Sequence, residues 1–180
     1  GLKEMTDAVH ENNGKIVAQL AHGGYYSHPK LIGKTPKAPS DARVLSSTPR
    51  EEMTADDIQL VIKAFEVAAQ RAKDAGFDGI QIHSAHGYLL SQFVSPRTNK
   101  RSDIYGGTIE NRIRFPVEVL KRVKDLVGQF PVGYRFLADE WLPDGLKPAE
   151  SKFLAKALSD NGAAYLSVMG GTYESFFIPE

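Results

Sequence analysis

Residues 77–88 read FDGIQIHSAHGY, a run in which a short apolar stretch gives way to polar and aromatic side chains. Ile80 and Ile82 occupy alternate positions, which is the pattern of a β-strand. His83 closes this strand, and a long segment rich in turn-forming residues follows it. The stretch therefore predicts a buried strand whose last residues carry the chemistry of the protein.

Strand and helix patterns alternate on both sides of this stretch. A helix precedes it, beginning at the capping residue Thr54, and its apolar residues recur at helical spacing. The same patterns predict strands at residues 15–20, 77–83, 131–137 and 164–169, and helices at residues 2–12, 54–75, 109–127 (interrupted near Pro116) and 148–161. Long loops are expected at residues 22–52 and 84–107. Loops of this length in a compact domain are usually functional or disordered.

Repetition of strand, loop and helix predicts an α/β protein with a parallel sheet. A doubly wound sheet and a (β/α)8 TIM barrel both fit. Polar residues occur near strand ends, where a barrel places its chemistry: Gln19, His83 and Arg135. No glycine-rich phosphate-binding turn follows a predicted strand, so we favour the barrel. Because closing a barrel takes about eight strands, we expect residues 1–180 to form a single, incomplete domain, with the other strands in chain outside this sequence.

The composition is that of an ordinary globular protein, with 42% hydrophobic and 24% charged residues among 180. Lys plus Arg and Asp plus Glu each number 22, and this balance gives no indication of a nucleic-acid partner. No apolar run approaches the roughly 20 residues that cross a bilayer, so no membrane partner is expected. Cysteine is absent, which excludes a thiolate nucleophile within these residues and suits a cytoplasmic location.

Two histidines three positions apart, His83 and His86, follow the strand and allow three interpretations. They could be loop residues bonded to backbone. They could ligate a metal, although no third ligand is evident nearby. They could also be paired donors that hold a carbonyl oxygen and stabilise negative charge on it, with Tyr88 as a proton donor. The residues alone leave these alternatives open.

Residues 83–119, HSAHGYLLSQFVSPRTNKRSDIYGGTIENRIRFPVEV, resemble the signature of the old yellow enzyme family, which includes NADH:flavin oxidoreductases and 2,4-dienoyl-CoA reductases. The strand sequences VAQL at residues 17–20 and VGYR at residues 132–135 are similar to the family as well. Two positions depart from its common pattern. Tyr25 stands where members often have Arg, and His86 stands where many have Asn.

The resemblance implies an FMN-binding barrel, of which this sequence would supply about strands three to six. It implies that Gln19 and Arg135 bind the flavin, Gln19 at the pyrimidine edge and Arg135 by N1 and O2. It also implies that His83 and His86 bind the carbonyl oxygen of an unsaturated substrate, with His83 facing the cofactor too. Tyr88 would donate a proton to the α-carbon. The implied activity, expected from the full-length protein, is NAD(P)H-dependent reduction of the C=C bond of α,β-unsaturated carbonyl compounds.

Other functions remain open alongside this one. A dienoyl-CoA reductase-type enzyme would carry an iron–sulfur cluster outside this sequence, and an inactive barrel piece or scaffold would carry no activity. A metal-dependent barrel hydrolase is a fourth interpretation. For Arg135 the alternative to a flavin ligand is an ion pair, and for Gln19 it is a bond to backbone. The expected partner is a small unsaturated carbonyl compound, and self-association into a homo-oligomer is a further expectation.

Overall fold

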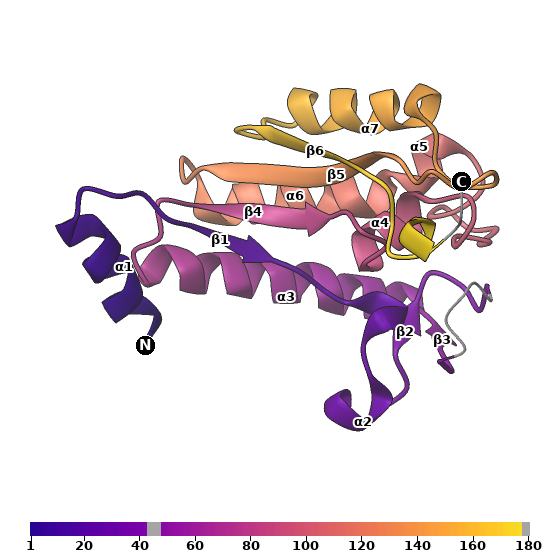
Figure 1. Ribbon diagram of the computed structural model, residues 1–180, viewed down its shortest axis with the longest axis horizontal. Helices are drawn as coiled ribbons and strands as arrows, with labels where there is room; N and C mark the ends of the chain where they lie inside the picture. The colour runs from indigo at the N-terminus through magenta and orange to yellow at the C-terminus, as the bar shows by residue number, and fades with distance from the viewer. Residues whose placement is uncertain (43–47, 178–180) are drawn as a thin grey trace.

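The computed structural model describes residues 1–42 and 48–177. Its elements follow the order α1 (Leu2–Glu11), β1 (Val17–Leu20), η1 (Gly24–Tyr26), α2 (Pro29–Ile32), β2 (Lys37–Ala38), β3 (Glu51–Glu52), α3 (Ala55–Asp74), β4 (Gly79–Ser84), α4 (Leu89–Val94), α5 (Ile109–Arg112), α6 (Arg114–Val127), β5 (Val132–Asp139), α7 (Pro148–Asp160), β6 (Leu166–Gly170) and η2 (Ser175–Phe177). Strands β1, β4, β5 and β6 form one sheet in that order, and Figure 1 shows them running side by side across the view.

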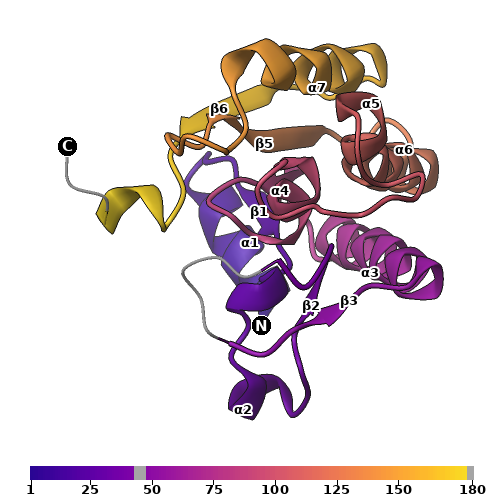
Figure 2. The ribbon, with the colours of Figure 1, turned by 90° about the vertical axis from the view of Figure 1, so that its right-hand side faces the viewer.

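All neighbouring strands in this sheet are parallel, and their order follows the chain. Helices α3, α6 and α7 each connect one strand to the next. Figure 2 shows these three helices in an arc around one face of the sheet. A doubly wound sheet places helices on both faces and reverses its strand order. The arrangement is therefore that of a barrel, as the sequence predicted.

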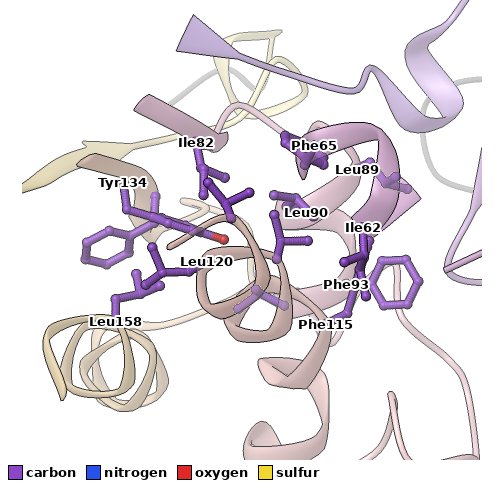
Figure 3. Packing of buried hydrophobic residues seen from close by; sticks show 14 of the residues in the cluster. Ile62, Phe65, Ile82, Leu89, Leu90, Phe93, Phe115, Leu120, Tyr134 and Leu158 are labelled. Atoms are coloured by element: carbon purple, nitrogen blue, oxygen red, sulfur yellow. The ribbon is translucent and has the colours of Figure 1, made fainter. Parts of the chain in front are cut away.

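The hydrophobic core lies between this arc of helices and the sheet. Ile80 and Ile82 of β4 are fully buried, as is Tyr134 of β5. Figure 3 shows Ile82 and Tyr134 beside Leu120 of α6 and Leu158 of α7. The Tyr134 hydroxyl donates to the carbonyl of Pro116, 3.3 Å away, so its one polar group is satisfied.

The other face of the sheet is polar and more open. Gln19 of β1 pairs in register with Gln81 of β4, so both side chains project from this face. A Cβ on Gly133 would lie 2.1 Å from Cζ of Tyr165, so glycine leaves room for the ring to lie against β5. The Tyr165 hydroxyl accepts a hydrogen bond from Nε2 of Gln81 at 3.1 Å. This face, opposite the packed core, is where residues that meet a ligand can project.

Several expected boundaries shift in the structure. The loop expected at residues 22–52 contains short elements, including the parallel pair β2–β3, although residues 43–47 lie outside the described residues. The long helix breaks at Ile113, between α5 and α6, and not at Pro116. Pro116 lies in the first turn of α6, where its missing N–H has no helical acceptor. Among the described residues no helix has both the length and the apolar character to cross a membrane.

Candidate functional site

The end of β4 turns sharply and brings the second histidine and the tyrosine back over the first. His86 and Gly87 both have a positive φ, 58° and 81°, a conformation that glycine adopts freely and that histidine tolerates better than most residues. A Cβ at Gly87 would meet Tyr26 at 3.1 Å. The chain then enters α4, with Tyr88 at its N-cap position. The turn therefore depends on residues in the HGY sequence itself.

Three rings converge at this turn. The centroids of His83 and His86 lie 5.2 Å apart, and those of His83 and Tyr88 also lie 5.2 Å apart. His86 and Tyr88 are 6.5 Å apart with perpendicular planes. The structure thus brings together all three residues that the sequence assigned to substrate activation.

Both histidines are electrically neutral near pH 7. Burial, with smaller contributions from His86 and Arg135, lowers the pKa of His83 to about 4. Burial and then Arg135 also lower the pKa of His86. A neutral imidazole still carries one N–H donor. The Nδ1 atom of His83 is buried and has no hydrogen-bond partner among the described residues.

Arg135 on β5 lies beside His83 on β4, because the two residues are register partners in neighbouring strands. Its Nη1 donates to Oε1 of Gln19 at 3.4 Å, across the intervening strand, and its Nη2 contacts Sδ of Met169 at 3.2 Å. The Nε atom is buried without a partner, and no carboxylate of the described residues pairs with Arg135. The structure therefore gives no support to the ion-pair alternative for Arg135.

A cavity of about 370 Å³ opens beside the convergent rings. Its lining consists of aromatic and imidazole side chains from three separate segments: Tyr26, His86, Tyr88, Tyr173 and Phe176. The Tyr26 ring meets Tyr88 edge-on at 6.2 Å and Tyr173 at 6.0 Å. The volume lies within the range of small-molecule sites, roughly 300–1,000 Å³.

A second cavity, of about 390 Å³, lies along the free edge of β1. Its lining is largely small and apolar, from β1 and α3, with Gln19 and His22 as its polar members. It contains none of His83, His86 and Tyr88. We therefore place the candidate site at the aromatic cavity, where titratable groups and apolar surface meet.

Sequence analysis assigned no function to two residues of the aromatic cavity, Tyr173 and Phe176. They follow β6 in the sequence GGTYESFF. The only sequence signal that could have pointed to them is a pair of glycines and several aromatic residues after a predicted strand. Tyr26 also lines the cavity, while its neighbour Tyr25 is buried, with 3% of its surface exposed.

Gln92 of α4 joins the turns that follow β1 and β4. Its Nε2 donates to the carbonyl of Gly87 at 2.6 Å, and its Oε1 accepts from the backbone N–H of Tyr25 at 3.4 Å. A Cβ at Gly24 would lie 2.3 Å from the same Oε1. Nothing in the sequence singled out Gln92, because it lies in a segment expected to be a loop and glutamine is usually solvent-exposed.

The segment after α4 supports the site through hydrogen bonds. Asn99 donates to the carbonyls of Phe93 and Tyr105, both at 2.7 Å. Arg101 donates to the carbonyl of Met53 at 2.6 Å, which ties this segment to the start of α3. Arg112 binds Glu150 of α7. These contacts fix neighbouring elements and leave the cavity lining to other residues.

Comparisons with known proteins agree with this geometry. The model of the NADH:flavin oxidoreductase / NADH oxidase family matches residues 1–173. The chain is 45% identical to an NADH oxidase of Thermoanaerobacter brockii, covering 97% of this chain and 27% of that protein. It is 37% identical to a cinnamate reductase of Clostridium sporogenes, over 97% of this chain and 29% of that one.

Among solved structures, the old yellow enzyme homologue of Zymomonas mobilis superposes with a TM-score of 0.84 at 35% identity, over 95% of this chain and 52% of that one. The fold and the matched structures define part of a TIM-barrel oxidoreductase. The chain belongs to the NADH:flavin oxidoreductase / NADH oxidase family. It spans between about a fifth and about half of the length of the curated relatives it matches.

Proposed function

We propose that this chain carries the substrate-activating residues of an FMN-dependent enzyme that reduces the C=C bond of α,β-unsaturated carbonyl compounds with NAD(P)H. The observation that carries the proposal is the convergence of His83, His86 and Tyr88 beside an aromatic cavity. Membership of a flavin oxidoreductase family supports the cofactor, and the name of the Clostridium relative, cinnamate reductase, supports the substrate class.

The residues on the open face of the sheet fit FMN. Nε of Arg135 and Nδ1 of His83 are buried polar atoms without partners among the described residues, and such atoms normally meet a ligand or water. We assign Gln19 and Arg135 to the polar edge of the flavin ring, with His83 between the cofactor and the substrate. Arg135 is permanently charged, so it suits a cofactor that gains negative charge on reduction. Bound FMN would supply the hydride.

His83 and His86 would hold the carbonyl oxygen of the substrate through their N–H groups. As hydride reaches the conjugated C=C bond, negative charge develops on this oxygen. Hydrogen bonds from fixed donors to the oxygen are therefore stronger in the transition state than in the ground state. Neutral imidazoles suit this role, since each still has an N–H group that can donate to the substrate oxygen. Loss of one such donor typically costs about 2.7–4 kcal/mol.

Tyr88 would donate a proton to the α-carbon of the substrate. Its ring borders the cavity and lies against His83, so a substrate held by the histidines is within reach of its hydroxyl. Three tyrosines line the cavity, and Tyr88 is the one whose ring lies against His83. Positioned proton transfer of this kind typically contributes about a hundred- to ten-thousandfold in rate.

Anaerobic absorption spectroscopy of the holoprotein tests the proposal. We expect a bound yellow flavin that bleaches on addition of NADH or NADPH and regains its colour when an enone is added without oxygen. A colourless protein that binds no FMN, or a reduced flavin that no enone reoxidises, would overturn it. Comparing the two nucleotides in the first step would also assign the hydride source.

A second candidate is a larger multidomain enzyme of the dienoyl-CoA reductase type. It is favoured by the coverage of the Thermoanaerobacter brockii relative, of which this chain spans 27%, against 52% of the Zymomonas mobilis homologue. Iron and acid-labile sulfide analysis of the purified protein separates the two. Stoichiometric iron would support the second candidate, and its absence would leave the simpler enzyme.

A further inference from the structure

The outer wall of the aromatic cavity comes from the segment after β6. Tyr173 is 61% exposed and Phe176 is 70% exposed, whereas Tyr26 on the other side is partly buried. Tyr173 is in edge-on contact with Tyr26, with ring centroids 6.0 Å apart. A ligand in the cavity would lie against Tyr173 and Phe176 and cover these exposed rings, so the position of this wall decides what the cavity accepts.

Backbone contacts attach the beginning of this segment to the site. Thr172 forms an isolated parallel bridge with His86. The N–H of Thr172 donates to Oγ of Ser175 at 2.7 Å, and this Oγ donates to the carbonyl of Thr172 at 2.9 Å. These bonds close a tight turn that contains Tyr173 and Glu174. Because these two bonds lie within the turn, they do not fix its orientation relative to the rest of the protein.

Glu174 provides a side-chain anchor for the turn. It is 3% exposed, and its Oε2 accepts from Nε of Arg97 at 3.1 Å. Nη1 of Arg97 binds both carboxylate oxygens of Asp144, at 2.6 and 2.8 Å. Arg97 follows α4, Asp144 follows β5 and Glu174 follows β6. One guanidinium therefore joins three loops at the rim of the site.

A buried carboxylate without its cation is strongly unfavourable, which makes this ion pair a fixed point. If Arg97 were absent, Glu174 would lose its bond to this guanidinium, and the turn would lose its link to the loops after α4 and β5. Tyr173 and Phe176, the neighbours of Glu174 in the chain, would move with it. The aromatic wall would then lose its position while the sheet, His83 and Tyr88 stayed in place.

We propose that Arg97 is a positioning residue that sets substrate preference: by holding Glu174 it fixes Tyr173 and Phe176 as the wall of a subsite for an uncharged aromatic substituent. This inference rests on the proposed enone reduction. Aromatic rings favour edge-on or offset contact with another ring, and the tyrosine and phenylalanine rings of the lining offer such contacts. Among the described residues, neither a carboxylate nor a Lys or Arg side chain lines the cavity, so a charged substituent would find no partner there.

The test compares two enones that differ only in a phenyl or methyl group, benzylideneacetone and ethylideneacetone, in the holoenzyme. For Arg97→Gln we expect the KM for benzylideneacetone to rise about tenfold with little change in kcat. The preference for benzylideneacetone, taken as the ratio of the two kcat/KM values, should fall by the same factor. Arg97→Lys, which keeps a cation beside Glu174, should recover part of this preference.

Two further variants keep the inference falsifiable. Asp144→Asn removes the outer contact of Arg97 but leaves Glu174, and the preference should stay at the wild-type value. Tyr173→Ala removes an exposed ring, which spares folding, and should lower the preference as Arg97→Gln does. An unchanged preference in Arg97→Gln or Tyr173→Ala would overturn the inference, as would equal losses for both enones.

The outcome for the wild-type enzyme separates this inference from the proposed function. If the wild type reduces neither enone, the enone-reductase proposal fails. If it reduces both with equal kcat/KM, the proposed function stands and the aromatic subsite is refuted.

Discussion

The ring of Tyr88 stands against the ring of His83 at a centroid distance of 5.2 Å, with an angle of 66° between their planes. Five positions separate them in the chain, and a turn through two residues with positive φ closes the gap. An N–H donor and a phenolic donor are thereby held within reach of one small ligand. Four predictions follow from this arrangement and from its surroundings.

Tyr88→Phe should slow reoxidation of the flavin by an enone while leaving its reduction by NAD(P)H nearly intact. The substitution removes one hydroxyl and keeps the ring contact with His83, so the expected loss is that of proton donation, about a hundred- to ten-thousandfold. Stopped-flow absorbance of the two half-reactions measures each rate separately. Equal losses in both half-reactions would remove Tyr88 from the proton-donor role.

His83→Ala and His86→Ala should each weaken the binding of phenols, whose phenolate oxygen resembles the charged oxygen of the substrate. A hydrogen bond to a charged group is worth about 1.5–3 kcal/mol, so the Kd should rise roughly ten- to hundredfold. Titration followed by the flavin spectrum measures it. His28→Ala, on the exposed side of the η1–α2 loop, is the matched control. Affinity unchanged in all three variants would refute the oxyanion role.

Arg135→Gln should weaken FMN binding and lower the midpoint potential of the bound cofactor. The charge of Arg135 stabilises the more negative reduced form, and losing about 1.4 kcal/mol of that stabilisation shifts a two-electron potential by about 30 mV. Reconstitution of apoprotein with FMN and a dye-based potential titration measure the two effects. Arg71→Gln, an exposed arginine on α3, should change neither. A potential that stays constant would place Arg135 away from the flavin.

The apoprotein should lose stability as the pH falls below 6.5, partly through His83. In the unfolded chain this imidazole takes up a proton near its ordinary pKa of 6.5, but in the fold only near 4. Between these values the unfolded state binds more protons, so the free energy of unfolding falls with pH. His83→Gln should therefore show a smaller drop in Tm between pH 7 and pH 5 than the wild type. The pKa of His86 is lowered as well, but His86 is present in both proteins and does not affect the comparison. Equal drops would show that His83 is not held neutral.

Periodicity was enough to predict the sheet and its helices. The four predicted strands correspond to β1, β4, β5 and β6, and each predicted helix has a counterpart near its expected position. Local signals were also enough for the start of α3, where Thr54 and Asp57 form the capping box. Periodicity did not give the position of the helix break: it falls at Ile113, and both α5 and α6 contact α4 and α7.

The sequence by itself determined the barrel-type order of strands and named His83, His86, Tyr88, Gln19 and Arg135, because strand ends and a long motif are local in the chain. Only the tertiary structure decided that Tyr173 and Phe176 share a cavity with Tyr26, and that one guanidinium, Arg97, joins three loops at its rim. These contacts join residues about 50 to 150 positions apart. Local chain preferences do not encode such contacts, which arise when the parallel strands bring the ends of successive loops to one edge of the sheet.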